Sequence, residues 1–174
     1  GYTPTNDLLN DAKQIIEVSQ KATYRAVNLA LVQRNWLLGY RIAQEELKGE
    51  GRSEYGTAVI RKLAKELTAA YGKGFDYSSL YKYFRFYNLY PEIVDSLSPQ
   101  SGVLLSWTHY RVLLQVEDKT ARDWYTKEAA NQTWSVRTLQ RNISSQYYYR
   151  LLKSQNQEPV KREMEKLTAG YQAD

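Results

Sequence analysis

"YSSLYKYFRFYNLY", residues 77–90, is the most aromatic stretch of this chain, and its residues predict a helix. Pro91 ends that helix, because the residue before a proline avoids helical geometry. At 3.6 residues per turn, one face of the helix carries aromatic rings and an adjacent face carries cations. The rings belong to Tyr77, Tyr81, Phe84 and Tyr87, with Asn88 as the alternative to the last, and the cations are Lys82 and Arg85.

The segments around this stretch predict a helix, a short turn and a second helix. A helix over 54–71 comes first, and the turn "GKGFD" (72–76) follows with two glycines. The same order recurs with helices at 121–131 and 135–153, and the second helix is again basic and aromatic. Helix-turn-helix proteins that read DNA place their second helix in the major groove. The layout therefore favours nucleic-acid binding, although it also occurs in many helical proteins that bind none.

The first part of the chain predicts one long helix, from Asn6 to Leu47, with apolar residues at spacings of three and four. About 40 residues would span roughly 60 Å, which is longer than a small globule is wide. We therefore expect either a break near Asn28 or Gly39, or a projecting end that pairs with another chain.

Shorter helices are predicted in the second half, where small polar residues can accept hydrogen bonds from the free amides of a first helical turn. The first of these helices begins at Ser106 or Thr108 and runs to Val116, and the second follows a Thr120 cap. The third runs from a Ser135 cap to about Lys153, and the last occupies 160–170. Strand-forming patterns are nearly absent apart from "SGVLLSW" (101–107). The expected fold class is all-α: a long N-terminal helix packed with helix-turn-helix units, winged-helix-like at most.

Composition excludes several classes of function. The chain has 174 residues, no cysteine and one histidine, which excludes disulfides, thiolate nucleophiles and cysteine-bound zinc. The net charge is +5, and residues 52–90 carry seven cations against three acids, while residues 129–157 contain no acid. Binding to a polyanion requires basic blocks of this kind. No apolar run is long enough to span a membrane, so we expect a cytoplasmic protein.

His109, in "SWTHYRVLL" (106–114), is the only histidine, so any imidazole base would have to be this residue. No nucleophile motif lies near it in the sequence, and its neighbours Trp107 and Tyr110 are typical core residues. We therefore expect His109 to form hydrogen bonds near a helix start and to pack. Together with Trp107, Tyr110 and Trp134 it is interpreted as a structural motif.

Two other catalytic motifs are incomplete. Glu46-Leu47-Lys48 has the acid-x-Lys letters of PD-(D/E)XK nucleases, but it lies at a helix end, whereas those nucleases hold Mg²⁺ with carboxylates on strands. "GEG" and "GKG" lack the preceding strand and the G-K-[ST] ending of a phosphate-binding loop. We predict no metal site, no cofactor and no catalytic activity for this chain.

The remaining candidates are polar side chains on the two second helices. In "SVRTLQRNISSQ" (135–146), Leu139 and Ile143 are expected to point inward, which leaves Arg137 and Arg141 outward. Arginine and lysine contact phosphates, and arginine and glutamine can read base edges. The predicted DNA-binding residues are Lys73, Lys82, Arg85, Arg137, Gln140 and Arg141. The alternative for the aromatic rings is core packing or a protein interface.

Several short motifs resemble the N-terminal domain of the YhcG-type bacterial proteins. The resemblance covers roughly residues 10–153 and is most specific at "YG" (55–56), "GKGF" (72–75), "LSWTHY" (105–110), "RDWY" (122–125) and "WSVR" (134–137). In that family the helical domain precedes a C-terminal nuclease domain of the PD-(D/E)XK superfamily. The resemblance therefore implies a DNA-binding or assembly module, and we expect the family's nuclease domain to be absent from this chain.

We predict one helical domain with helix-turn-helix units over residues 1–157, followed by a linker or short terminal helix over 158–174. Its predicted function is non-catalytic binding of nucleic acid, most of all duplex DNA, as the N-terminal module of a bacterial nuclease-family protein. We also expect a homodimer formed through the long first helix. The alternative is a module for protein–protein interaction or oligomerisation that does not contact nucleic acid.

Overall fold

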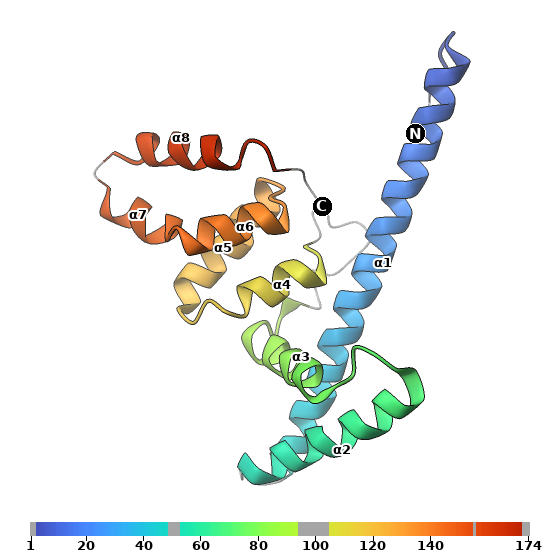
Figure 1. The fold of residues 1–174 in the computed structure, drawn as a ribbon, viewed down its shortest axis with the longest axis vertical. Helices are drawn as coiled ribbons and strands as arrows, with labels where there is room; N and C mark the ends of the chain where they lie inside the picture. Colours follow the sequence, from blue (N-terminus) through green and yellow to red (C-terminus); the bar gives the residue numbers. More distant parts are fainter. Residues whose placement is uncertain (1–2, 49–52, 94–104, 155, 172–174) are drawn as a thin grey trace.

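The computed structural model describes residues 3–48, 53–93, 105–154 and 156–171, and these ranges contain eight helices and no strand (Figure 1). The all-α class predicted from the sequence is confirmed, and the described part has no β-hairpin that could serve as a wing. Most of the predicted extended piece, residues 101–104, lies outside the described residues. The helices are α1 (Leu8–Leu47), α2 (Ser53–Tyr71), α3 (Tyr77–Leu89), α4 (Trp107–Leu113), α5 (Lys119–Asn131), α6 (Val136–Ser144), α7 (Tyr147–Lys153) and α8 (Gln157–Thr168).

The long helix α1 is continuous, so the predicted break near Asn28 or Gly39 does not occur. Asp7 caps it, because its side chain accepts a hydrogen bond from the backbone N–H of Asn10 at 3.0 Å. Its C-terminal half packs against the body of the molecule, and its N-terminal half extends away from the other helices (Figure 1). The structure thus has the other expected form, a helix with a projecting end.

Gly39 is the residue that lets α1 and α3 cross closely. A Cβ atom at position 39 would lie 2.0 Å from the carbonyl oxygen of Tyr83, which is a backbone atom of α3. The crossing is reinforced nearby, where the Trp36 indole N–H donates to the carbonyl of Tyr90 at 2.9 Å. The glycine that the sequence marks as a helix breaker is therefore used for packing, at a cost of roughly 1 kcal/mol in helix propensity relative to alanine.

Helix α3 buries a different face from the one that its aromatic spacing emphasises. Leu80, Tyr83 and Phe86 are buried, whereas Tyr77 and Tyr81 are 38% and 44% exposed. The reason is tertiary: both sides of the helix are rich in rings, and the side that meets α1 and α4 is the one that becomes buried. The sequence pattern found the helix without identifying its inner face.

Two clusters of buried residues form the core, and α3 contributes to both. Leu80 and Tyr83 join Ile42 and Ile60 in the cluster between α1, α2 and α3. Phe86 belongs to the larger cluster, which includes residues of α1 and of the helices from α4 to α8. Trp107, at the start of α4, packs against both clusters and so connects the two halves of the molecule.

The predicted helices of the second half are present, but several of their ends differ, and α8 lies at Gln157–Thr168 instead of 160–170. Asp118, not Thr120, caps α5, because its carboxylate accepts from the backbone N–H of Thr120 at 2.8 Å. Helix α4 ends at Leu113, before the predicted Val116. The helix predicted to run to Lys153 is split into α6 and α7.

The split between α6 and α7 occurs at Gln146. This residue adopts a left-handed conformation with φ of 56°, which ends one helix and redirects the chain into the next. The last helix, α8, packs back on the bundle through Met164, which is 2% exposed. The division of the chain at residue 157 stays a prediction, although α8 contributes Met164 to the larger core cluster.

Candidate nucleic-acid interface

Helix α6 presents a polar face to solvent. The hydroxyl of Ser135 caps it by accepting from the backbone N–H of Thr138 at 3.1 Å. Leu139 is fully buried, and this orients the opposite side of the helix outward. Residues three and four apart lie together on a helix, so the exposed side chains form one row. The row consists of Arg137, Gln140 and Arg141.

Arg137 is held in place by an aromatic ring. Its guanidinium carbon lies 4.4 Å from the centroid of the Tyr171 ring, within the range of a cation–π contact. Tyr171 follows α8, so a residue near the end of the chain supports a cation on α6. This contact orients Arg137 and leaves its charge uncancelled.

The other predicted cations lie on α3 and on the turn before it. Lys73 is exposed between Gly72 and Gly74, whose φ values of 80° and 97° place both glycines in the left-handed region. Lys82 is partly exposed on α3. Arg85 has a structural contact, because its guanidinium donates to the carbonyl of Leu114 at 2.9 Å and so ties α3 to the end of α4.

The structure places the predicted DNA-binding residues in two groups. One group lies on α3 and its preceding turn, and the other lies on α6. Helix α4 lies between them (Figure 1), since Arg85 bonds to its C-terminal end and His109 bonds to the turn before α6. The sequence predicts that one of the two second helices, α3 or the helix that contains α6, enters a DNA groove. Because the two groups of cations lie apart, either helix stays a candidate.

The charge of these cations is not cancelled by acids in the described part of the chain. The ion pairs found there join other cations to acids: Arg41 and Lys48 to Glu45, Lys119 to Asp123, Arg150 to Glu163, and Lys161 to Glu158. Lys73, Lys82, Arg137 and Arg141 take part in none of them. A phosphate approaching α6 would therefore meet uncompensated positive charge.

His109 connects the start of α4 to the turn before α6. The Ser106 hydroxyl accepts from the His109 backbone N–H, and the Ser106 backbone N–H donates to His109 Nδ1 at 3.2 Å, which completes a capping box. His109 Nε2 lies 2.8 Å from the carbonyl of Trp134, and because a carbonyl only accepts, Nε2 carries the proton. Both ring nitrogens are thus used in structural hydrogen bonds.

Sequence comparison places this arrangement in a family. The profile of the family described as "DUF1016 N-terminal domain" matches residues 11–150, which include α2 to α6 and nearly all of α1. The chain belongs to this family. The match ends within α7, so α8 and Tyr171 lie outside the residues that the DUF1016 N-terminal domain profile covers.

One relative of this DUF1016 N-terminal domain is the "Putative nuclease YhcG" of Escherichia coli (strain K12). The two sequences are 30% identical over 168 residues, which covers 80% of this chain and 44% of the relative. The chain thus spans less than half the length of the relative that it matches. The resemblance to the YhcG-type family stated from the sequence motifs is confirmed. No solved structure shows significant similarity to the chain.

The largest pKa shifts among the described residues of this DUF1016 N-terminal domain belong to buried tyrosines. Burial raises the pKa of Tyr90 to about 12, against a smaller lowering effect of its hydrogen bond with Thr126. Burial also raises the pKa of Tyr110. These rings lie in the core, where a phenol that keeps its proton packs without the cost of a buried charge.

The described residues contain neither a metal-binding cluster nor a membrane-spanning helix. No group of three or more histidine, cysteine, aspartate or glutamate side chains is placed to hold a metal ion. No described helix combines the length and the apolar character needed to cross a membrane.

Sequence reasoning missed Tyr171 as a partner of Arg137. A lone tyrosine in a short tail carries no local pattern, and only the packing of α8 brings it to α6. Sequence reasoning also predicted Arg85 as a DNA-binding residue and missed its hydrogen bond to the carbonyl of Leu114. A hydrogen bond between two helices cannot be predicted from the spacing of residues.

Proposed function

We propose that this DUF1016 N-terminal domain binds nucleic acid, most of all duplex DNA, without catalysing a reaction on it. In this proposal it is the DNA-binding N-terminal module of a bacterial nuclease-family protein. The observation that carries the proposal is the row on α6, in which Arg137, Gln140 and Arg141 are exposed together and the two arginines have no ion-pair partner in the described part.

The proposed mechanism assigns different tasks to these side chains. Arg137 and Arg141 neutralise phosphates and release counterions, which supplies affinity independent of sequence. Arg137 contributes more per contact, because Tyr171 already holds it in one orientation. Gln140 lies between the arginines on the same face and can donate to and accept from a base edge. Lys73 and Lys82 supply further phosphate contacts from α3 and its turn.

The test is DNA affinity across a salt series. Fluorescence anisotropy with a labelled duplex should give log affinity that falls linearly with log salt concentration, by about 0.9 for each phosphate contact. Arg137→Ala/Arg141→Ala should weaken binding and reduce the slope by roughly 2. The matched control is Lys119→Ala/Lys127→Ala, which removes the same charge from α5 and should change affinity far less.

A second pair of variants identifies the helix that contacts DNA. Lys73→Ala/Lys82→Ala removes two cations from the α3 group and leaves Arg85 to hold α4. If α6 is the contacting helix, this variant should lose less affinity than Arg137→Ala/Arg141→Ala. Binding that is undetectable at low salt, or that the α5 control weakens equally, would contradict the proposal.

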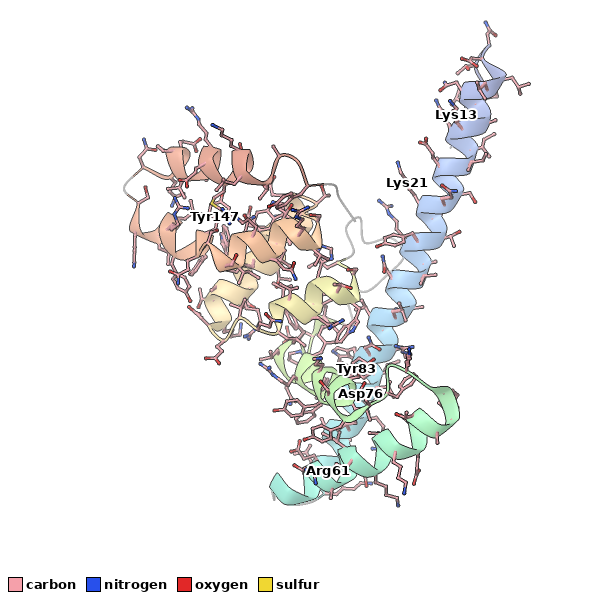
Figure 2. The ribbon with its side chains drawn as sticks, viewed as in Figure 1. Lys13, Lys21, Arg61, Asp76, Tyr83 and Tyr147 are labelled. Carbon is pink, nitrogen blue, oxygen red and sulfur yellow. The ribbon has the colours of Figure 1, made fainter. Side chains whose placement is uncertain are left out.

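A second candidate function, oligomerisation, is favoured by the projecting half of α1. Its larger apolar side chains are exposed and include Leu8, Leu9, Ile15, Ile16 and Val18. At 100° per residue Leu8 and Ile15 lie together at the centre of this apolar side, and Leu9 and Val18 lie at its two edges. Lys13 and Lys21 lie on the other side of the helix, toward the rest of the molecule (Figure 2). The apolar face therefore points away from the core that the described residues form, where another molecule can cover it.

If α1 serves in oligomerisation, we propose that its partner is a second copy of this chain. The exposed apolar face continues along the packed half of α1 through Leu37, which is 53% exposed, and Tyr40. A stripe that runs the length of a 40-residue helix is suited to a helix of equal length, and the same α1 in another copy provides one. A homodimer would also present two α6 rows, in the way that dimeric DNA-binding proteins present two reading helices.

A further inference from the structure

A cavity of about 420 Å³ lies among α5, α6, α7 and α8, on the C-terminal side of the molecule. Its volume falls within the range of small-ligand sites. Three aromatic rings from separate elements line it: Trp124 on α5, Trp134 in the turn before α6, and Tyr147 on α7 (Figure 2 labels Tyr147, between α8 and α6). The cavity is thus built from parts of the chain that only the tertiary fold brings together.

The three rings pack against one another where they line the cavity. The Trp124 and Tyr147 centroids are 5.4 Å apart with an interplanar angle of 87°, and Trp124 and Trp134 are 6.3 Å apart at 63°. Trp134 and Tyr147 are stacked, with centroids 6.2 Å apart and an interplanar angle of 29°. Ring faces carry negative partial charge, so a ring face that borders the cavity attracts a cation placed against it.

Acidic side chains at the cavity also favour a bound cation. Glu128 and Glu165 line the cavity, and no ion pair involves either of them among the described residues. Lys161 also lines it, but its ammonium lies 3.6 Å from the carboxylate of Glu158. The pKa of Tyr147 is raised by burial first and then by the nearby Glu165, Glu128 and Glu158, which indicates a negative potential at the cavity.

The cavity also holds an unused hydrogen-bond acceptor. Asn142 lines it and is 2% exposed, and its side-chain oxygen Oδ1 has no hydrogen-bond partner among the residues that the structure describes. Buried polar atoms without a partner are uncommon in folded proteins, because each one forfeits the hydrogen bond that it makes to water when unfolded. A ligand that donates a hydrogen bond would satisfy this atom.

We propose that this cavity binds an organic cation, an alkylammonium or guanidinium group. The aromatic walls, the two carboxylates and the open acceptor of Asn142 all favour a group that is positively charged and donates hydrogen bonds. The sign of the charge is opposite to that of the α6 row, so the site is separate from the nucleic-acid proposal and does not depend on it. Helix α8, which contributes residues to the lining of the cavity, lies outside the residues that the family profile matches.

The four tryptophans of the chain provide a local readout. The probe is N-acetyl-L-arginine amide, and the indole N–H signals are followed by NMR in ¹⁵N-labelled protein. The Trp124 and Trp134 signals should shift and saturate with a dissociation constant on the order of 1 mM, which is typical of a single-group contact. Trp36 and Trp107 lie away from the cavity and should not move. The neutral isostere N-acetyl-L-citrulline amide should bind at least about tenfold more weakly.

A second arm distinguishes the two sources of such a cation. Tetramethylammonium stands for a free small-molecule cation, and the arginine derivative stands for a protein side chain. Tighter binding of the arginine derivative would support a partner protein, because only the guanidinium can donate to Asn142 Oδ1. Tighter binding of tetramethylammonium would contradict the proposed hydrogen bond to Asn142, because that cation has no N–H to donate.

Charge variants test the walls of the site. Glu128→Gln/Glu165→Gln should weaken binding of the arginine probe by roughly tenfold or more, since it removes two charges and keeps the shape. Lys161→Met should strengthen binding by removing a competing cation. The control Glu92→Gln/Glu117→Gln changes the same charge at exposed positions that do not line the cavity. The proposal is overturned by an absence of saturable shifts in Trp124 and Trp134, by equal binding of the citrulline probe, or by unchanged binding in Glu128→Gln/Glu165→Gln.

Discussion

At the scale of single residues, His109 uses its backbone and both of its ring nitrogens in hydrogen bonds that connect two parts of the structure. Its backbone N–H and Nδ1 complete the cap of α4, and Nε2 holds the carbonyl of Trp134 before α6. The side chain is buried, so each of these hydrogen bonds replaces one to water that is lost on folding. One imidazole thereby fixes the relative position of two helices.

His109→Ala is expected to destabilise the domain by about 3 kcal/mol, from the lost cap and from two buried polar groups left without partners. The measurement is urea denaturation followed by circular dichroism. Thr108→Ala, at the exposed neighbouring position, is the control and should stay within about 0.5 kcal/mol of the wild type. A His109→Ala variant as stable as the parent would mean that these hydrogen bonds contribute nothing.

Tyr149 and Asp118 give a prediction about pH. The Tyr149 hydroxyl donates to the Asp118 carboxylate at 2.8 Å, and this bond is the main reason why the pKa of Asp118 is lowered, ahead of its bonds to backbone amides. A carboxyl whose pKa is lowered by folding contributes stability above its unfolded pKa, and that contribution is lost as pH falls through the folded pKa. Tyr149→Phe should therefore raise the pKa of Asp118, lower the stability of the domain at neutral pH, and leave less of that stability to be lost as the pH falls.

The check for this pair is an NMR titration of the Asp118 carboxyl carbon in both proteins. Tyr71→Phe removes a hydroxyl from an exposed ring on α2 and serves as the control, with no expected change at Asp118. An Asp118 titration curve that is the same with and without the Tyr149 hydroxyl would show that the backbone amides alone set its pKa.

At the scale of elements, the crossing of α1 and α3 depends on a missing side chain. Gly39→Ala would improve helix propensity by about 1 kcal/mol, but its Cβ would meet the backbone of Tyr83 at 2.0 Å. Backbone atoms of a packed helix cannot rotate aside, so α3 must move. We expect a net loss of about 2 kcal/mol or more in the free energy of unfolding.

Thermal or urea denaturation measures this loss. Gly170→Ala is the matched control, because a Cβ there would have nothing within 4 Å. Its stability should lie close to that of the wild type or slightly above it. A Gly39→Ala protein that gains stability would show that α1 and α3 can separate at no cost.

At the scale of the whole molecule, the two halves of the long helix α1 have different surroundings. The C-terminal half of α1 is buried against α3, and the N-terminal half exposes a full apolar face. Burying one large apolar side chain contributes roughly 1.5–3 kcal/mol, so several such residues along one face can hold two chains together. We therefore expect the protein to be a dimer by sedimentation velocity.

Substitutions on the two faces of α1 test that expectation. Ile15→Glu/Ala22→Glu places charges in the apolar face and should shift the equilibrium to monomers. Gln14→Glu/Lys21→Glu changes the opposite face and should leave the dimer intact. Neither pair touches the core, so circular dichroism should show a folded domain in both. A wild-type protein that stays monomeric at high concentration would contradict the homodimer.

The features that depend on neighbouring residues could be predicted from the sequence alone. They include the all-helical class, the row of Arg137, Gln140 and Arg141, and the family. Caps and turns act over a few residues, so the Ser135 cap could be assigned from its local pattern, and Ser106 was one of two candidates together with Thr108. Tertiary packing sets which face of α3 is buried, lets Gly39 join two helices instead of ending one, and brings Trp124, Asn142 and Glu165 around one cavity. These features arise where distant segments meet, and the shape of such a contact is set by packing, which residue spacing does not encode.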